Sequence, residues 1–251
     1  MFSIRLPFLF VVLLLSGCAT TNPQDPLEPF NRSMYKVNDT LDQAVAKPLA
    51  EGYNTIMPAP GKTAVNNFFS NLDDIVVTVN DVLQFKMKQA ASDAGRLTLN
   101  TTVGLLGLID VATPIGLEKH NEDFGQTLGF WGVTSGPYLV LPVLGPSSFR
   151  DGIGDYADSF LGVWHQVDDI SARNSLTGAD MLHRRANLLG ADTLLDDAAL
   201  DPYSFMRNAY LLRRQNLVYD GEPPRQKYED DYEDEEYEEE EPESEPVPPA
   251  P

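Results

Sequence analysis

The chain has 251 residues, 42% of them hydrophobic, which is enough to bury a sizeable core in one large domain or two small ones. Its 38 acidic and 18 basic residues give a net charge of −20, which argues against a nucleic-acid binder because phosphates require a basic face. The single Cys rules out an intrachain disulfide. With only three His it also argues against a structural zinc site, so we expect no metal and no cofactor.

The first 17 residues have the pattern of an export signal. One basic residue, Arg5, precedes an apolar run from Leu6 to Leu15, and the small residues Ser16 and Gly17 follow. The run is too short to cross a bilayer, which needs about 20 apolar residues. Residues 1–17 are therefore predicted to be a signal peptide.

The signal ends in Leu15-Ser16-Gly17-Cys18, which resembles the lipobox of bacterial lipoproteins. The resemblance implies cleavage after Gly17 and acylation of Cys18. Because no Asp follows the Cys, it also implies sorting to the periplasmic face of the outer membrane of a Gram-negative bacterium. Several acyl chains together anchor a protein stably. The alternative is a plain secretory signal with a chance Cys.

The mature chain divides into three parts. Residues 18–26 form a lipidated polar tether, residues 27–221 form the body and residues 222–251 form a tail. The tail holds 14 acidic and two basic residues and ends in a Pro-rich run. Dense like charge with few apolar side chains does not offset the entropy lost on ordering, so the tail is predicted to be disordered.

Helical patterns dominate the first half of the body, where we predict helices over residues 27–46, 61–72 and 74–103. Residues 103–109 (VGLLGLI) follow as a short apolar run with two glycines. Strand-like alternation is almost absent from the chain and is found only around residues 138–141.

Residues 124–149 contain no charged side chain in 26 positions, but five Gly and three Pro interrupt them. A straight lipid-facing helix would leave backbone groups unpaired near each Pro, so this segment is predicted to break into short pieces. Gly129 and Gly136 are expected to serve close packing or a positive φ. The apolar segments form either an ordinary buried core or a surface in the bilayer interface.

The last part of the body is again helical. Apolar residues recur at intervals of three and four over residues 176–189, as on one face of a helix. A final helix is predicted over residues 202–218, with Asp201 as N-cap and Pro202 in the first turn.

Motifs for covalent catalysis are missing. In Gly132-Val-Thr-Ser-Gly136 the Ser stands one position late for a G-x-S-x-G elbow, and the three His lack the H-E-x-x-H spacing. We therefore expect no enzyme. The alternatives are an envelope lipoprotein with a lipid hydrolase activity or one with a purely structural role.

An ordered series of motifs across residues 25–219 resembles the MlaA family, also called VacJ lipoproteins. The motifs are Asp25-Pro-Leu-Glu-Pro-Phe-Asn-Arg32, Val65-Asn-Asn-Phe-Phe-Ser-Asn-Leu72, Asn100-Thr-Thr, Gly107-Leu-Ile-Asp-Val-Ala112, Glu122-Asp-Phe-Gly-Gln-Thr-Leu-Gly129, Gly136-Pro-Tyr-Leu-Val-Leu-Pro142 and Arg150-Asp151. Two stretches depart from the family pattern. Asp73-Asp74-Ile75 replaces an acid followed by Pro, and Phe85-Lys-Met-Lys88 replaces a Gly-Lys loop.

The resemblance implies an all-α fold, in which one ring-like helical domain lies in the inner leaflet of the outer membrane around a polar channel. It implies a non-enzymatic phospholipid translocation channel that removes mislocalised phospholipids from the outer leaflet and so maintains lipid asymmetry. The implied partners are phospholipid, the outer membrane, a trimeric porin and a soluble periplasmic phospholipid carrier. Candidate lipid-channel or family-motif residues are Asn67, Phe68, Asn71, Asn100, Asp123, Gly125, Gln126, Gly129, Arg150 and Asp151.

Replacing the only Cys tests the predicted lipid anchor. We expect Cys18→Ala to accumulate as uncleaved precursor or as soluble protein without acyl modification, because the thiol that accepts the lipid is gone. Membrane fractionation and mass spectrometry of the intact protein provide the measurement. Acylated, outer-membrane-bound Cys18→Ala protein would contradict the lipobox interpretation.

Overall fold

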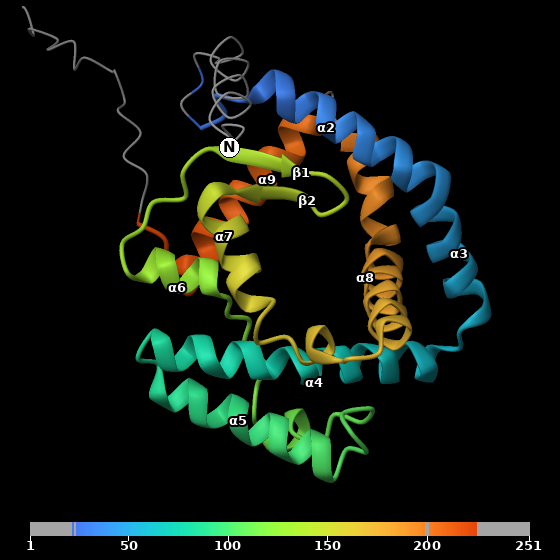
Figure 1. Cartoon of the computed structure of the whole chain (residues 1–251), viewed down its shortest axis with the longest axis vertical. Helices are drawn as coiled ribbons and strands as arrows, with labels where there is room; N and C mark the ends of the chain where they lie inside the picture. Colours follow the sequence, from blue (N-terminus) through green and yellow to red (C-terminus); the bar gives the residue numbers. More distant parts are fainter. Residues whose placement is uncertain (1–21, 23, 199–200, 225–251) are drawn as a thin grey trace, which may run out of the picture.

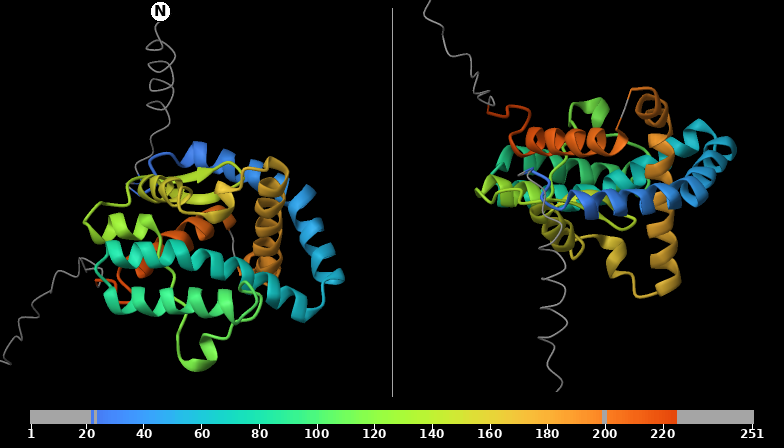
Figure 2. Two further views of the ribbon diagram at one scale, coloured as in Figure 1. Left: turned by 60° about the horizontal axis from the view of Figure 1, so that its bottom comes forward. Right: turned by 90° about the horizontal axis from the view of Figure 1, so that it is seen from above.

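Helices arranged in a ring make up most of the computed structural model, which describes residues 22, 24–198 and 201–224 (Figure 1). The predicted signal peptide, Cys18 and the tail beyond residue 224 lie outside the described residues. Seen from above in Figure 2, most helices lie in one layer, and one helix, α8, crosses this layer. No helix in the described ranges is both long enough and apolar enough to cross a membrane.

One curved helical rod forms the first arc of the ring. It consists of α2 (Glu28–Leu41), a π-helical turn η1 (Asp42–Ala46) and α3 (Lys47–Ile56), which follow one another without a break. The predicted end at residue 46 is therefore wrong. The wider π-turn accommodates Pro48, whose missing N–H would interrupt a regular α-helix.

An antiparallel helix pair forms the second arc. It consists of α4 (Ala59–Leu83) and α5 (Met87–Thr102), which pack along their length. The predicted break at residue 73 is wrong, because Asp73 and Asp74 are solvated or paired within a continuous helix. The true turn lies at residues 84–86, where Phe85 adopts a positive φ of 62° and no Gly or Pro marks the site.

The uncharged segment is broken into short pieces, as predicted. It contains helix α6 (Phe124–Phe130) and an antiparallel hairpin of β1 (Tyr138–Leu141) and β2 (Gly145–Ser148), in which Tyr138 pairs with Ser148. Gly136 has a φ of 68°, and a Cβ on Gly129 would lie 2.8 Å from Val218. The expected positive φ and the expected close packing are both confirmed.

The chain then returns to its beginning. Helix α7 (Phe149–Asp158) packs on α6, a 3₁₀ turn η3 (Val163–Gln166) leads to α8 (Ile170–Ala198), and α9 (Pro202–Val218) packs against α6 and β2. A second 3₁₀ turn, η2 (Thr113–Ile115), lies between α5 and α6. The bounds predicted for α9 are confirmed, including the N-cap Asp201, whose side chain accepts a bond from the Ser204 N–H.

A polar contact between the first and last helices closes the ring, and we call it the ring clasp. The Arg32 guanidinium makes a two-pronged ion pair with Asp201, at 2.6 and 3.0 Å, and lies 4.4 Å from the centre of the Tyr203 ring. The buried Asp25 accepts bonds from the Tyr203 hydroxyl and, at 3.1 Å, from Arg207. The clasp therefore fixes the N-terminal segment to α9.

The distribution of side chains is inverted relative to that of a typical water-soluble domain. Among the described residues, 19 polar or charged residues are buried but only nine hydrophobic ones, while 31 large hydrophobic residues are exposed. An exposed stripe runs along the first rod at intervals of four, with Val37, Leu41, Val45 and Leu49 between 48% and 58% exposed. Contiguous exposed apolar surface of this kind marks a membrane or partner interface.

Two buried carboxyl groups interact between α4 and α5, and of their four oxygens only Asp93 Oδ2 has another described partner, His120 at 2.8 Å. Asp81 and Asp93 are both fully buried, and within the described chain neither oxygen of Asp81 nor Oδ1 of Asp93 has a hydrogen-bond partner. Burial, followed by the interaction with Asp93, raises the pKa of Asp81 to about 8. Asp81 is therefore protonated at neutral pH in the folded protein.

This protonation makes stability depend on pH. Because the folded pKa of Asp81 exceeds the unfolded value of about 3.9, the free energy of unfolding should fall as pH rises from about 4 to about 8. Asp81→Asn, whose amide can donate to Asp93, should be more stable than the natural protein at pH 8 by about 1–3 kcal/mol and similar to it at pH 4. Urea unfolding across this range measures the difference, with the exposed Asp168→Asn as control. If Asp81→Asn and the natural protein show the same dependence of unfolding free energy on pH, the raised pKa assigned to Asp81 is refuted.

Candidate functional site

Two capped helix starts meet at the inner side of the ring. Asp123 caps α6 by accepting a 2.8 Å bond from the Gln126 N–H, and Ser148 caps α7 by accepting a 3.1 Å bond from the Asp151 N–H. The helices cross at Gly125 and Gly154, where a Cβ on Gly154 would lie 2.3 Å from the Gly125 nitrogen. Only glycine allows this approach, which brings the Asp123 and Asp151 carboxylates close together.

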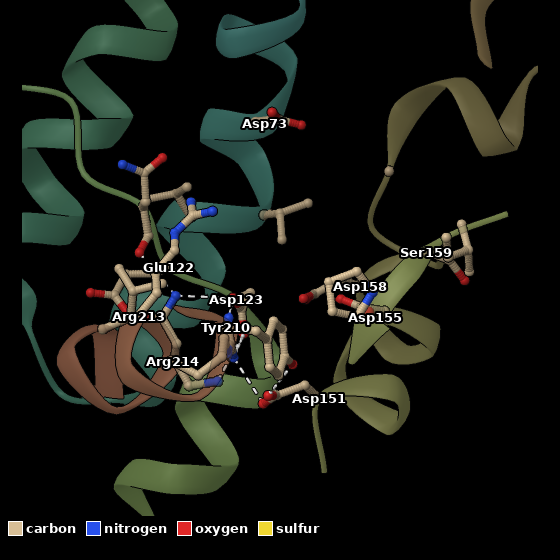
Figure 3. A pocket seen from close by; sticks show the side chains of 18 of the residues that line it. Asp73, Glu122, Asp123, Asp151, Asp155, Asp158, Ser159, Tyr210, Arg213 and Arg214 are labelled. Atoms are coloured by element: carbon tan, nitrogen blue, oxygen red, sulfur yellow. Dashed lines mark hydrogen bonds and ion pairs between the residues drawn. The ribbon is translucent and has the colours of Figure 1, made fainter. Parts of the chain in front are cut away.

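Arg214 of α9 joins both carboxylates, and we call these residues with Tyr210 the Arg214 cluster (Figure 3). The guanidinium bonds Asp123 at 2.6 and 2.9 Å and Asp151 at 2.9 Å, and the Tyr210 hydroxyl donates to Asp151 at 2.6 Å. Burial alone would raise the pKa of both carboxyls, but Arg214 keeps the pKa of each below its usual value. The cluster therefore stays ionised and ties α6, α7 and α9 together.

A cavity of about 630 Å³ opens beside the Arg214 cluster, between α4, α6, α7, α8, α9 and the β-hairpin. Its lining combines charged groups with apolar side chains such as Val77, Leu144 and Leu217. The charged side chains of the lining are Asp73, Glu122, Asp123, Asp151, Asp155, Asp158, Arg184, Arg213 and Arg214. The cavity lining is thus rich in charged groups, whereas most of the large exposed hydrophobic residues lie outside the lining.

Six of the ten candidate residues from the sequence line this cavity or lie next to it. Asp123, Gln126 and Asp151 line it, and Gly125 packs against Asp151 and Arg214 directly behind it. Arg150 is 6% exposed and bonds the Asp151 carboxylate at 2.9 Å. Gly129 is placed next to the cluster by its close approach to Arg150 and α9.

The other candidates lie at the far end of α4 and α5, where they hold the loop of residues 103–112. Asn100 accepts bonds from the N–H groups of Val111 (2.8 Å) and Ala112 (3.1 Å), and Asn71 donates to Thr101 at 2.9 Å. Asn67 donates to the Leu108 carbonyl at 3.3 Å, and Phe68 packs edge-to-face on Phe69. None of these four candidates lines the cavity described above.

This loop presents a second apolar surface. Leu105 and Leu106 adopt positive φ values of 55° and 58° and are 63% and 68% exposed. Their backbone conformation is costly for a residue with a side chain, and buried Asn side chains at its base stabilise it. The four distal candidates thus position an exposed apolar loop.

Sequence reasoning did not single out several residues that line the cavity, namely Asp155, Asp158, Tyr210, Arg213 and Arg214. One signal was present in the sequence. Asp151, Asp155 and Asp158 are spaced i, i+4 and i+7, which places three carboxylates on one face of α7. No local pattern in α9 distinguishes the Arg pair from ordinary surface arginines.

The comparisons with known proteins all lead to the same protein family. Residues 23–217 match the family model described as MlaA lipoprotein. The chain is similar to the intermembrane phospholipid transport system lipoprotein MlaA of Escherichia coli strain K12, with 37% identity covering 87% of this chain and 92% of the relative. It is similar to the protein of that name from Haemophilus influenzae, with 34% identity covering 85% and 90%.

A solved structure is also similar. It comes from work on the structural basis for maintenance of bacterial outer membrane lipid asymmetry and has a TM-score of 0.69 and 34% sequence identity. The match covers 77% of this chain and 98% of the solved chain.

A methyl group at the helix crossing tests the packing of the site. A Cβ on Gly125 would lie 2.7 Å from Asp151 Oδ1 and 2.9 Å from Arg214 Nη2, so Gly125→Ala should destabilise the protein by about 1–3 kcal/mol. Gly178 of α8 has open space around its Cα, so Gly178→Ala should stabilise by about 0.5–1 kcal/mol. Thermal unfolding of both variants measures the contrast. Equal shifts in both would show that the crossing is not tightly packed.

Proposed function

The chain belongs to the MlaA lipoprotein family, and on that basis we propose that phospholipid headgroups pass through its polar cavity while its apolar exterior sits in the outer membrane. It is a lipoprotein of an intermembrane phospholipid transport system that maintains the lipid asymmetry of the outer membrane. The inverted distribution of side chains is the observation that supports the mechanism. Crossing a leaflet is costly for a headgroup unless protein supplies a polar path.

The exterior supports a seat in the inner leaflet. The stripe on the first rod, the loop of residues 103–109 and Val143 at the hairpin tip all expose large apolar side chains. A layer of helices with an apolar outer surface gains free energy when acyl chains replace water around it. Acylated Cys18 would add an anchor seven residues before Asp25, which the ring clasp holds in place.

The direction of transport assigns two partners. Phospholipid must be accepted from the outer leaflet and released toward the periplasm, so we propose that the ring works with a trimeric porin and with a soluble periplasmic phospholipid carrier.

The proposed transport role includes no step in which a covalent bond of the lipid is broken. In the described chain, His120 contacts Asp93, and His183 contacts Asn66, Tyr53 and Asn187, so neither ring activates a Ser or Thr hydroxyl.

A deletion strain tests the function against the hydrolase alternative. We expect loss of the protein to increase the outer-leaflet phospholipid that an external phospholipase can reach in intact cells. We also expect the purified protein to produce no lysolipid or free fatty acid from phospholipid vesicles, as judged by mass spectrometry. Unchanged outer-leaflet phospholipid would contradict the transport role, and lysolipid production would favour a hydrolase.

Site-specific photo-crosslinking tests the seat in the leaflet. Crosslinkers at Phe130, Trp131 and Val143, which are 48%, 51% and 63% exposed, should label acyl chains because these positions lie on the apolar surface. The exposed polar position Asp168 provides the control and should give little labelling. Absence of lipid adducts at all three apolar positions, in correctly localised protein, would mean that this surface faces protein or solvent.

A further inference from the structure

The cavity is more acidic than the passage of an anionic lipid requires. Six carboxylates but only three guanidinium groups line it. A phospholipid phosphate carries negative charge, so an excess of carboxylates repels any headgroup that has no compensating positive charge. The charges of the lining that are not already paired within the protein are therefore the ones that a headgroup meets.

Most of these charges are already neutralised within the protein. Arg184 pairs with Asp73 at 3.0 Å, Arg214 pairs with both Asp123 and Asp151, and Glu122 pairs with Lys86 at 2.9 Å. These pairs hold the ring together, and their charges are not available to a ligand without breaking an ion pair.

Two charged groups of opposite sign remain available. Neither the Asp155 carboxylate nor the Arg213 guanidinium has a side-chain hydrogen bond or ion pair among the described residues, and both are solvent-accessible. Figure 3 shows Asp155 with Asp158 on the α7 side of the cavity and Arg213 on the α9 side. Asp158 is different, because it accepts bonds from Asn80 (3.0 Å) and from the Phe124 N–H (2.8 Å).

Among the described residues no cation forms an ion pair with Asp155, because Arg214, the nearby positive charge that lowers its pKa, is already paired with Asp123 and Asp151. Desolvation, followed by the negative charge of Asp123, raises the pKa of Asp155 to about 6. Such a carboxylate is ionised at neutral pH and gains most from a cation brought by a ligand. Gln126, which is 2% exposed and lines the same cavity, has an unpartnered carbonyl oxygen Oε1. This acceptor also favours a ligand that carries N–H donors.

We propose that the cavity recognises a zwitterionic amine headgroup, as in phosphatidylethanolamine, with its ammonium on Asp155 and its phosphate on Arg213. This inference rests on the proposed function, because it assumes that phospholipid enters the cavity. An anionic headgroup such as that of phosphatidylglycerol offers the phosphate to Arg213 but leaves Asp155 unpaired beside additional negative charge. The cavity thus prefers the amine headgroup for two reasons: an anionic headgroup lacks the attraction to Asp155, and its additional negative charge is repelled there.

The test is competitive lipid capture by the purified full-length protein. The protein is mixed with vesicles containing equal amounts of phosphatidylethanolamine and phosphatidylglycerol and then repurified, and its bound phospholipid is quantified by mass spectrometry. We expect phosphatidylethanolamine to be enriched about 2- to 5-fold over the vesicle ratio, because one solvent-accessible ion pair changes affinity by about this factor. Asp155→Asn should abolish the enrichment, and Asp155→Lys should reverse it.

Matched variants separate charge recognition from damage to the fold. Asp168→Asn removes an exposed carboxylate outside the cavity and should leave the enrichment unchanged. Arg213→Gln should lower the total of both lipids bound, whereas Arg213→Lys, which keeps the charge, should retain most of it. A structural role of Asp155 would not predict the reversal of preference by Asp155→Lys.

The outcomes distinguish this inference from the proposed function. If the natural protein binds both lipids in the vesicle ratio and the Asp155 variants do the same, the headgroup preference is overturned while lipid transport stands. If the protein captures neither lipid, the proposed function fails, and the headgroup preference fails with it.

Discussion

Arg214 is the residue on which the inner side of the ring depends. Its guanidinium bonds the N-cap carboxylate of α6 and the first-turn carboxylate of α7, so one side chain of the last helix fixes two helix starts. A charge held in this way requires complete pairing, because removing one partner leaves the others buried without compensation. The Gly125–Gly154 crossing supplies the closeness that the pairing needs. The close crossing of α6 and α7 and the ion pairs of Arg214 therefore depend on each other.

The inverted side-chain distribution follows from the same principle. Because few apolar residues are buried, the interior is built from carboxylates, amides and guanidinium groups, and most of them pair with one another within the ring. Stability then comes from directional bonds more than from an apolar core. The protein resembles a membrane protein in this respect, although none of its described helices could cross a bilayer. A polar cavity and an apolar exterior are two consequences of one arrangement.

The sequence predicts those elements whose ends carry local chemistry. Helix α9 was predicted to the residue because Asp201 and Pro202 mark its start, and the breaks within residues 124–149 followed from their Gly and Pro. The helix predicted over residues 74–103 missed the turn at Phe85, where a bulky residue adopts a positive φ, although the family resemblance indicated a loop at this position. Family motifs identified Asp123, Gln126 and Asp151. Asp155 and Arg213 come from elements far apart in the sequence, and only the ring brings them to the same cavity.

The ring clasp also determines when the fold can be completed. Arg32 and Asp201 are 169 positions apart, so the contact that joins the first helix to the last can form only when nearly the whole body is present. Segments made early in synthesis can fold before the rest of the chain, but this contact needs both ends of the body. Until α9 arrives, the helical arc is open and its polar inner side and apolar outer side face the same solvent. A body that ends before α9 therefore lacks the ring clasp and the Arg214 cluster together, so the last helix completes both the ring and the cavity.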